Sequence, residues 1–480
     1  MRRLLLAIAR SKLSSTKLDE DSQHPLEDWI CNKVAVEAKK EPELRRAIGR
    51  VRAEEVDLEA LREYQLFRVR QQLRYTQQNS YYYKKKLKEA GINPSVIKEF
   101  SDLTKIPITE PKDLAEDSMG FLCVSQTKVM RAFTTSGTSG NRKRLFYTRA
   151  DVLNIVDAIA AALKDVGMKK NDTLQIMFPT VAAWDPGLML ESACKVAGLN
   201  AVNASTIDIQ EQLRIMKEHR TTMMIGLTSF LYRLTILAKD KEDLSSFGIK
   251  AIICSAEPLP EAMRRELESA WGCKALSQYG MTEMGLATTI ECQAQDGMHV
   301  DMADYLPEVV NPKTGEHVGN REEGELIWTS LNFEGSPLIR YRSYDLSMRI
   351  DPPCGCGMSV LGKIGKIKGR MDMQSKIGLG DKVYPLLFDE ALLKIPGVLG
   401  YNATIENSGY RDLLRFRVEY SGDPKEGKKL MEESLLSLDE IRVGIENDLL
   451  EPPIVEITPP DQEHWVPKTR SLIDKRKQFD

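Results

Sequence analysis

A loop rich in hydroxyl groups and glycine, Arg131–Lys143 (RAFTTSGTSGNRK), contains the residue types that bind phosphate groups. Gly137 and Gly140 lack a Cβ, so the backbone can turn tightly there and approach a ligand closely. Neighbouring threonine and serine hydroxyls and backbone N–H groups donate hydrogen bonds, and Lys143 adds a positive charge. This combination predicts a cradle for a polyphosphate.

Two other interpretations of the loop are less favoured. A flexible Ser/Gly linker has a similar composition, but it needs neither the apolar, strand-like residues Val129–Phe133 before the loop nor Lys143 after it. The usual P-loop pattern G-x-x-x-x-G-K-[ST] does not fit, because Asn141 follows Gly140. We therefore expect a nucleotide bound in a different loop geometry.

The overall composition is that of a globular protein with two or three domains. The chain has 480 residues, 42% of them hydrophobic and 29% charged. A net charge of −3 gives no electrostatic reason to expect nucleic acid or an anionic membrane surface as a partner. No apolar run approaches the ~20 residues of a membrane span. Eight cysteines are too sparse for a disulfide scaffold, which favours a reducing compartment, and we expect the cytoplasm.

The first residues, MRRLLLAIARSKLSS, are basic, as in a targeting peptide. The apolar run Leu4–Ala9 is shorter than a secretory core, however, and no small-residue cleavage pattern follows it. We interpret this segment as an amphipathic helix.

Short β-rich runs alternate with helical stretches after residue 173. The predicted strands are Thr173–Phe178, Asn200–Ser205, Thr222–Leu227, Ala251–Ala256 and Lys274–Tyr279, and the predicted helices lie near 187–198, 208–219, 229–239 and 260–271. This alternation predicts βαβ units and a mainly parallel sheet. Ligands of such sheets bind at the carboxyl ends of the strands, where Ser255–Pro258 and Ser277–Glu283 follow.

Other segments differ in pattern. Residues 42–90 predict amphipathic helices, and β-hairpins are expected after residue 290. A small α+β unit follows Arg370, with predicted strands Tyr401–Glu406, Leu413–Tyr420 and Ile454–Thr458 and a helix Lys428–Leu449. The expected fold class is α/β: a large N-terminal domain with parallel βαβ sheets and a β-rich subdomain, and a small C-terminal α+β domain.

Five short segments occur in a fixed order along the chain. They are TTSGTSG with Lys143; SAEP (255–258); YGMTE (279–283); RYRSYD (340–345) with GRMD (369–372); and VPKTR (466–470). Each alone could be structural, as a core tyrosine, a charge at a helix start or a surface lysine. Together they resemble the adenylate-forming superfamily, most closely its phenylacetate–coenzyme A ligase and coenzyme F390 synthetase branch. The resemblance covers about residues 60–480.

The resemblance implies specific roles for these residues. Tyr279 would stack on adenine, Thr282 would bind the α-phosphate and Glu283 would hold Mg²⁺. Asp345 would accept hydrogen bonds from the ribose hydroxyls, with Arg370 beside it. The other implied ATP- and AMP-binding residues are Thr135, Ser136, Gly137, Thr138, Ser139, Gly140 and Lys143 at the phosphates, Ser255, Ala256, Glu257 and Pro258 at the adenine, and Gln278, Gly280 and Met281 beside Tyr279.

The C-terminal part has two implied functional positions. Asp372 would be the hinge between the domains, and Lys468 would be a mobile catalytic lysine that acts with Thr282 and Glu283. The implied domains are an N-terminal helical extension (1–60), a large ATP- and acyl-binding domain (61–370) and a small mobile domain (371–480). Closure of a separate domain would bring the lysine charge to the reacting phosphate and expel water.

Two departures from the family pattern affect these segments. The segment after Arg370, MQSKIGLGDKVYP, is one residue longer than the family's usual run to glycine and proline. This difference bears on the role of the hinge loop in the family's second reaction step, the transfer of the acyl group. Ser343–Tyr344 replaces the common Thr-Gly before the ribose-binding Asp345, and the bulky tyrosine predicts a changed local backbone.

Cys292, His299, Cys354 and Cys356 form a second candidate site. Three thiolates and one imidazole suit a closed, tetrahedral, structural Zn²⁺ site. The alternative is four unrelated reduced residues, since the spacing is not that of a zinc finger. The same branch has similar EC…GMH and PCGCG segments, which favours zinc in a β subdomain at about 290–365. The remaining cysteines, Cys31, Cys123, Cys194, Cys254 and Cys273, are expected to be buried and structural.

The expected activity is ATP-dependent conversion of a carboxylic acid to acyl-AMP with release of pyrophosphate, followed by transfer to coenzyme A. An aryl or arylacetic acid is favoured by Trp184 and several methionines in the candidate acyl-pocket segments Val181–Gly187, Gly226–Phe230 and Met281–Leu286. Two alternatives stay open: transfer of AMP to a cofactor hydroxyl, as in the F390 synthetases, and a non-catalytic nucleotide-binding scaffold. The oligomeric state also stays open, a homodimer included.

Overall fold

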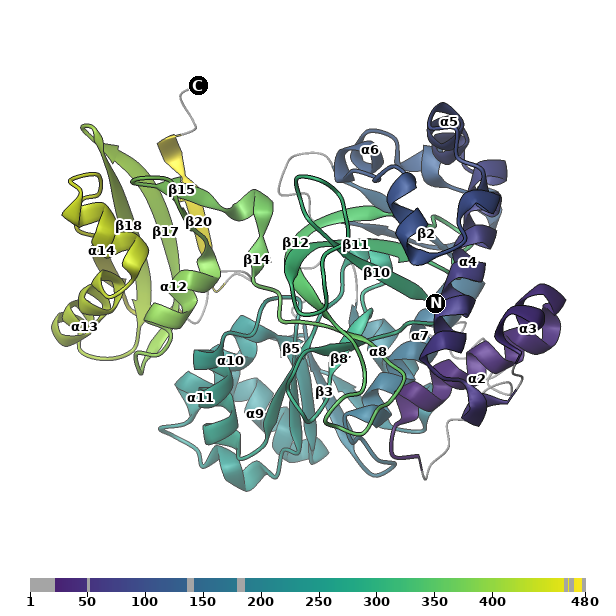
Figure 1. The fold of residues 1–480 in the computed structure, drawn as a ribbon. Helices are drawn as coiled ribbons and strands as arrows, with labels where there is room; N and C mark the ends of the chain where they lie inside the picture. The colour runs from purple at the N-terminus through teal and green to yellow at the C-terminus, as the bar shows by residue number, and fades with distance from the viewer. Residues whose placement is uncertain are drawn as a thin grey trace. The chain divides into compact units, whose positions relative to one another are not determined.

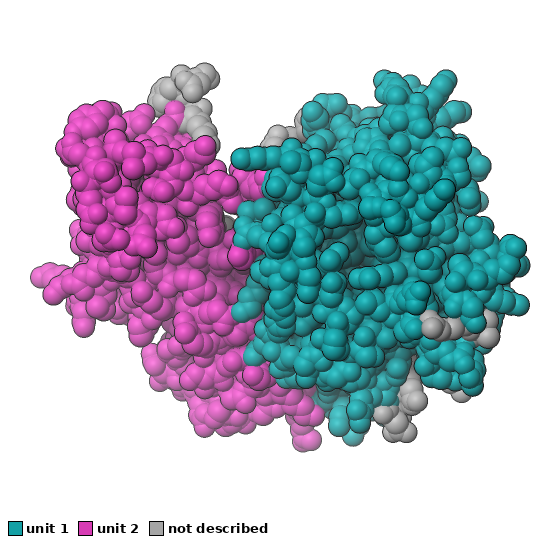
Figure 2. All heavy atoms as spheres, in the orientation of Figure 1, with its two compact units in different colours: residues 1–203, 276–366 teal, residues 204–275, 367–480 magenta. Residues whose placement is uncertain are grey.

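The computed structural model describes residues 22–49, 52–135, 142–178, 186–461, 465 and 470–476 (Figure 1). The chain forms two units, each made from two stretches of sequence (Figure 2). The first unit comprises residues 1–203 and 276–366, and the second comprises residues 204–275 and 367–480. The predicted amphipathic helix at the N-terminus lies outside the described residues.

The predicted alternation of strands and helices is present with small shifts at the ends. In the first unit, β3 (Thr173–Met177) is followed by α8 (Pro186–Ala197) and β4 (Asn200–Asn203). The second unit continues with α9 (Ile209–His219), β5 (Met223–Leu227), α10 (Thr228–Ala238), β6 (Ala251–Ser255) and α11 (Glu261–Trp271). The chain returns to the first unit within β7 (Lys274–Gln278).

Parallel pairing confirms the predicted kind of sheet. β3 pairs with β4 in the register Thr173↔Asn200, and β5 pairs with β6 in the register Met223↔Ala251. Every residue of β3, β5 and β6 is buried. Burial on both faces is typical of parallel strands covered by helices, and it explains why β5 (MMIGL) and β6 (AIICS) are apolar along almost their whole length rather than alternating. In β3 (TLQIM) the polar side chains of Thr173 and Gln175 are buried as well.

The first unit also contains N-terminal helices and an antiparallel hairpin at the two ends of the phosphate-loop segment. The N-terminal helices are α2 (Pro25–Lys40), α3 (Pro42–Ile48), α4 (Leu58–Asn79), α5 (Tyr81–Glu89) and α6 (Pro111–Glu116). β1 (Val129–Thr134) and β2 (Arg144–Thr148) then pair antiparallel on either side of the loop. α7 (Arg149–Asp165) follows at once, with Thr148 as its N-cap.

The predicted β-rich region forms an antiparallel sheet. Its strands follow the path β10-β11-β12-β13-β9-β8. They are β8 (Thr289–Glu291), β9 (Met298–Val300), β10 (Tyr305–Val310), β11 (Glu323–Ser330), β12 (Tyr341–Ile350) and β13 (Lys363–Ile364). The large side chains of Trp328 and Tyr341 are fully buried and anchor the core of this sheet.

The C-terminal part of the second unit is α+β, as predicted. A four-stranded sheet has the order β19-β18-β17-β20. Its strands are β17 (Val398–Ser408), β18 (Arg411–Tyr420), β19 (Ile454–Thr458) and β20 (Ser471–Asp474). A small hairpin, β15 (Ser375–Ile377) and β16 (Asp381–Val383), precedes α12 (Pro385–Leu392).

The prediction of one helix over Lys428–Leu449 is wrong. The segment forms two helices, α13 (Pro424–Leu436) and α14 (Asp439–Glu446). Ser437 ends α13, and its hydroxyl donates to the carbonyl of Ser434 at 2.6 Å. Leu438 is extended, and Asp439 then lies in the first turn of α14, where the helix dipole favours a carboxylate. A serine that bonds the local backbone therefore ends the helix, although the helical spacing of apolar residues continues beyond it.

No helix among the described residues is both long and apolar enough to cross a membrane.

Candidate active site and metal centre

The hairpin positions the ends of the phosphate loop. The Thr135 N–H donates to the carbonyl of Lys143 at 3.0 Å, and the Lys143 N–H approaches Oγ1 of Thr135 at 3.3 Å. The loop is therefore closed at its base by backbone pairing that continues the hairpin. The predicted phosphate-binding residues Ser136, Gly137, Thr138, Ser139 and Gly140 lie outside the described residues.

Lys143 and Glu283, predicted to bind phosphate and Mg²⁺, lie together. Nζ of Lys143 is 2.5 Å from Oε1 of Glu283, and the hydroxyl of Tyr341 donates to the same oxygen at 2.9 Å. Nζ of Lys143 is also 3.2 Å from the Tyr341 hydroxyl. Glu283 is buried, in the short helix η7 (Thr282–Met284). A buried carboxylate beside a lysine at the base of the loop suits a hard cation that is bound together with phosphate.

Tyr341 is a candidate site residue that the sequence analysis did not single out. It is fully buried at the start of β12. It lies within the RYRSYD segment, so the motif contained the signal, but a tyrosine in a strand is most simply interpreted as core. Only the fold brings its hydroxyl to Glu283.

The turn that carries Thr282 and Glu283 is held in place by Tyr147 of β2. The Tyr147 hydroxyl donates to the carbonyl of Thr282 at 2.7 Å and accepts from the Gly285 N–H at 3.2 Å. On the other side of this turn, a Cβ at Gly280 would lie 1.7 Å from the carbonyl oxygen of Leu286. Gly280 is therefore required for the close approach of two backbone segments.

The predicted adenine and ribose residues of the first unit also lie together. The hydroxyl of Tyr279 donates to Oδ2 of Asp345 at 2.7 Å. The Tyr279 ring stacks on Trp328, with centroids 6.0 Å apart and planes 22° apart. Burial, together with the charge of Asp345, raises the pKa of Tyr279 well above its usual value, so its hydroxyl stays protonated and donates. Trp328 carried no sequence signal beyond its apolar character.

Tyr344 adopts a backbone conformation that is usual for glycine. Its φ is +63°, in the left-handed region. Its side chain compensates for this strain, because its hydroxyl donates to Glu110 at 3.1 Å and Arg342 lies over its ring at 5.6 Å. The Asp345 N–H approaches Oγ of Ser343 at 3.0 Å. The local geometry thus suits the glycine of the family pattern, although the residue differs.

The predicted adenine-pocket segment Ser255–Pro258 belongs to the second unit. Ser255 is the last residue of β6, and Ala256, which follows it, has a φ of +64°. Oε2 of Glu257 accepts from the Ser229 N–H at 2.8 Å and lies 3.7 Å from the guanidinium of Arg470. The carboxylate of Glu257 is therefore bound by protein groups at the carboxyl end of a parallel strand.

The predicted hinge region forms its own ion pair. Nη2 of Arg370 lies 2.8 Å from Oδ2 of Asp372, and both side chains are exposed. Arg370 belongs to β14 (Gly369–Arg370) and Asp372 to the short helix η8 (Met371–Met373). They belong to the second unit, so their placement relative to Asp345 stays a prediction. Lys468 lies outside the described residues, as do Val181–Asp185 of the candidate acyl pocket.

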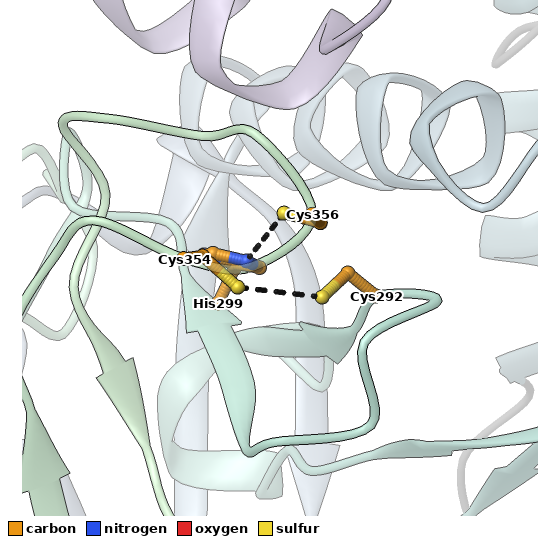
Figure 3. A group of neighbouring side chains, drawn as sticks. All are labelled: Cys292, His299, Cys354 and Cys356. Atoms are coloured by element: carbon orange, nitrogen blue, oxygen red, sulfur yellow. Dashed lines mark hydrogen bonds between the residues drawn. The ribbon is translucent and has the colours of Figure 1, made fainter.

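The four predicted metal ligands converge (Figure 3). Cys292 follows β8, His299 lies in β9, and Cys354 and Cys356 lie in the turn after β12. Their ligand atoms all lie within 4.8 Å of one another. Sγ of Cys292 is 3.7 Å from Sγ of Cys354, and Sγ of Cys356 is 3.5 Å from Nε2 of His299.

These separations suit zinc. Tetrahedral Zn²⁺, with Zn–S of about 2.3 Å and Zn–N of about 2.0 Å, separates two sulfurs by about 3.8 Å and a sulfur from a nitrogen by about 3.5 Å. Burial and the nearby Lys363 lower the pKa of His299 to about 4, so its imidazole is neutral and able to ligate. Burial raises the pKa of Cys292 to about 12, so binding of a metal there must displace a proton.

The other cysteines agree with the expectation of ordinary packing, with one difference. Cys31, Cys123, Cys194 and Cys254 are buried, whereas Cys273 is only partly buried.

The comparisons with known proteins identify the family. The model of the AMP-binding enzyme family matches residues 84–332, more than half of the chain. The protein therefore belongs to the AMP-binding enzyme family, which is the adenylate-forming superfamily. Within it, the chain belongs to the phenylacetate–coenzyme A ligase branch. A phenylacetate–coenzyme A ligase of Aromatoleum evansii is 29% identical over 382 residues, which are 78% of this chain and 85% of the relative. That of Escherichia coli K12 is 28% identical over 76% of this chain and 84% of its own length.

A solved structure confirms the fold class. A 2-hydroxyisobutyryl-CoA ligase, in the postadenylation state with its acyl-AMP, has a TM-score of 0.75 at 23% identity. The match covers 88% of this chain and 90% of that chain.

Proposed function

We propose that this protein is an AMP-forming acid–coenzyme A ligase. It activates a carboxylic acid with ATP to give acyl-AMP and pyrophosphate, and then transfers the acyl group to coenzyme A. The observation that supports this most directly is the cluster of Lys143, Glu283 and Tyr341 at the base of the phosphate loop. The Tyr279–Asp345 pair, at the positions of the adenine- and ribose-binding residues in this family, supports it further.

In the first step, a carboxylate oxygen of the acid bonds to the α-phosphorus while the bond to the pyrophosphate oxygen breaks. Two anions must meet, so positive charge and exclusion of water are what the protein has to supply. Lys143 would hold the outer phosphates, Thr282 would donate to the α-phosphate, and Lys468 would approach the reacting oxygens. Glu283 would hold Mg²⁺, which when bound neutralises phosphate charge.

The second step needs a different arrangement of the small domain. The thiol sulfur of coenzyme A bonds to the acyl carbon, the thiol proton is lost and AMP leaves. A separate C-terminal domain (371–480) with a hinge at Asp372 would allow one face to present Lys468 and another to meet the thiol. The domain boundaries at residues 60 and 370 are part of this proposal.

An aryl or arylacetic acid is the substrate class that we propose. Four relatives named phenylacetate–coenzyme A ligase, each matched over at least 76% of this chain, support it. The eight free cysteines support a reducing compartment, and we infer the cytoplasm.

We further propose that Cys292, His299, Cys354 and Cys356 hold a structural Zn²⁺. Three thiolates and a neutral imidazole around Zn²⁺ carry a net charge of −1. The buried ammonium of Lys363, whose Nζ is 3.3 Å from Sγ of Cys354, would offset that charge.

A panel of aryl and aliphatic carboxylates tests the proposed activity. Release of AMP and pyrophosphate is measured with and without coenzyme A, and the thioester is identified by mass. We expect AMP release that depends on an aromatic acid and a thioester that forms only with coenzyme A. Acid-dependent pyrophosphate exchange without any thioester would point to AMP transfer to another acceptor, and its complete absence would point to a nucleotide-binding scaffold.

A further inference from the structure

The C-terminal domain contacts the segment after β6 through charged groups within the second unit. Nη1 of Arg470 lies 2.9 Å from Oδ2 of Asp389 in α12. Nη2 of the same guanidinium donates to the carbonyl of Pro258 at 3.1 Å and lies 3.7 Å from Oε2 of Glu257. Arg470 therefore bridges α12 and the predicted adenine-binding segment.

Glu390, the next residue of α12, makes a second contact with the same segment. Its Oε1 accepts from the Glu261 N–H at 2.7 Å, and its Oε2 accepts from the Ala262 N–H at 3.3 Å. These are the first N–H groups of α11, whose own N-cap residue, Pro260, provides no side-chain bond. A carboxylate from the C-terminal domain thus caps a helix of the ATP-binding part.

The charges in this contact are buried. The side chains of Arg470, Asp389 and Glu257 are only 6%, 4% and 6% exposed. Burial raises the pKa of Asp389 to about 6, with Arg470 acting against this effect. Because desolvation offsets much of the attraction in a buried ion pair, such pairs contribute little net stability, but they penalise any geometry that leaves one charge unpaired. This contact is therefore suited to defining one docked position.

We propose that Arg470, Asp389 and Glu390 form a docking clamp that fixes the C-terminal domain on the Glu257–Ala262 segment for the adenylation step. The assignment to adenylation rests on the proposed function, in which that segment binds adenine and Lys468 acts on the α-phosphate. Arg470 follows Lys468 by two residues, which span at most about 7 Å. Anchoring Arg470 therefore fixes the attachment point of the catalytic segment, and Arg470 is a positioning residue.

The clamp must release before the thioester step, because the same domain then presents another face. Loss of the clamp should consequently impair the two half-reactions unequally. Adenylation should fall by about 10- to 100-fold, since small misplacements of a catalytic group cost rates of that order. Thioester formation from preformed acyl-AMP should change by less than about threefold, because the clamp is already released in that step. A change of this size corresponds to well under 1 kcal/mol.

The test variant is the double substitution Arg470→Met and Asp389→Leu. It removes the two charges of the closer ion pair together, and Glu257, the other carboxylate beside Arg470, keeps its hydrogen bond from the Ser229 N–H. Arg470→Lys is a conservative rescue variant that should recover part of the adenylation rate. Arg442→Met is the matched control, since Arg442 is half-exposed on α14 and pairs only locally, with Asp439 and Glu446.

Docking is measured directly by the distance between spin labels on unnatural amino acids at Ser269 in α11 and Lys429 in α13. Both positions are exposed. We expect one narrow distance distribution in the unsubstituted protein and in the Arg442→Met control, and a broad one in the double variant. An unchanged distribution in the double variant overturns the clamp, whatever the protein's activity.

The half-reactions then test the role of the clamp. Pyrophosphate exchange reports adenylation, and a single turnover of synthetic acyl-AMP with coenzyme A reports thioester formation. Loss of exchange with retained thioester formation supports the clamp, whereas equal losses, or none, overturn its role in adenylation. If the protein gives no exchange with any acid but the label distances still change in the double variant, the clamp is supported and the proposed function is rejected.

Discussion

The ammonium of Lys143 and the carboxylate of Glu283 lie 2.5 Å apart, with the Tyr341 hydroxyl donating to the same carboxylate oxygen. The two charged residues are separated by 140 positions in sequence and come from a hairpin and a short helix. Tyr341, from a third element, holds the orientation of Glu283. This three-residue cluster brings the base of the predicted phosphate loop and the predicted metal-binding carboxylate together.

Tyr341→Phe should lower the rate of pyrophosphate exchange by about tenfold or more, because a hydrogen bond to a charged group is worth about 1.5–3 kcal/mol. The apparent affinity for Mg²⁺–ATP should fall with it. Tyr410→Phe is the control, since that tyrosine is exposed and its hydroxyl bonds Asp448 instead of Glu283. Equal rates in the two variants would remove Tyr341 from the site.

Gly280→Ala should disrupt the turn before Thr282. The new Cβ would overlap the carbonyl of Leu286, and the backbone shift that relieves the overlap should cost about 1–3 kcal/mol of unfolding free energy. Thermal unfolding and pyrophosphate exchange are the measurements. In Gly362→Ala the new Cβ makes only ordinary contacts, the nearest at 3.5 Å, so this control should leave both unchanged.

Lys468→Ala should depress acid-dependent pyrophosphate exchange by about 10²–10³-fold, the effect of losing one preorganised charge. ATP binding, measured by calorimetry, should survive. Lys475→Ala serves as the control, because Lys475 pairs with Glu406 on the surface of the same domain. Unchanged exchange in Lys468→Ala would exclude this lysine from the mechanism.

Asp372→Pro should separate the two half-reactions at the proposed hinge. Proline fixes φ near −65° and removes an N–H, so it should hinder rotation of the C-terminal domain. We expect acyl-AMP formation to persist while thioester formation from preformed acyl-AMP falls by about tenfold or more. Asp372→Ala loses the same ion pair with Arg370 but keeps a free backbone, so it should retain both steps. Losses of equal size in Asp372→Pro would mean that the junction has unfolded.

Purified protein made with zinc supplied should contain about one zinc per chain, and Cys354→Ser should lose it and unfold at a lower temperature, because a closed metal site contributes folding free energy. Metal analysis and thermal unfolding are the readouts. Cys273→Ser changes a cysteine outside the cluster and should keep the metal. Absence of zinc from the unsubstituted protein would end the hypothesis.

Much of the fold, and the convergence of the four cysteine and histidine side chains, was predictable from the sequence. The strand Ile454–Thr458 matches its predicted bounds, and β3 to β7 lie within one or two residues of theirs, because the alternation of short strand-like runs with amphipathic stretches is a local property. That Cys292, His299, Cys354 and Cys356 lie together was predicted from residue types and from the resemblance, since thiolates and imidazole have few other reasons to recur together.

The sequence by itself thus determined which residues carry charge, hydroxyl or thiol and the order in which they occur. Only the tertiary structure decided which of them meet. Tyr341 beside Glu283, Trp328 behind Tyr279, and Arg470 against Asp389 all join residues that are 49 to 81 positions apart. No local periodicity specifies such pairs, because they depend on how buried strands and helices pack in three dimensions. The break at Ser437 shows the same limit on a smaller scale, since a serine that bonds its own backbone ended a helix that the apolar pattern continued.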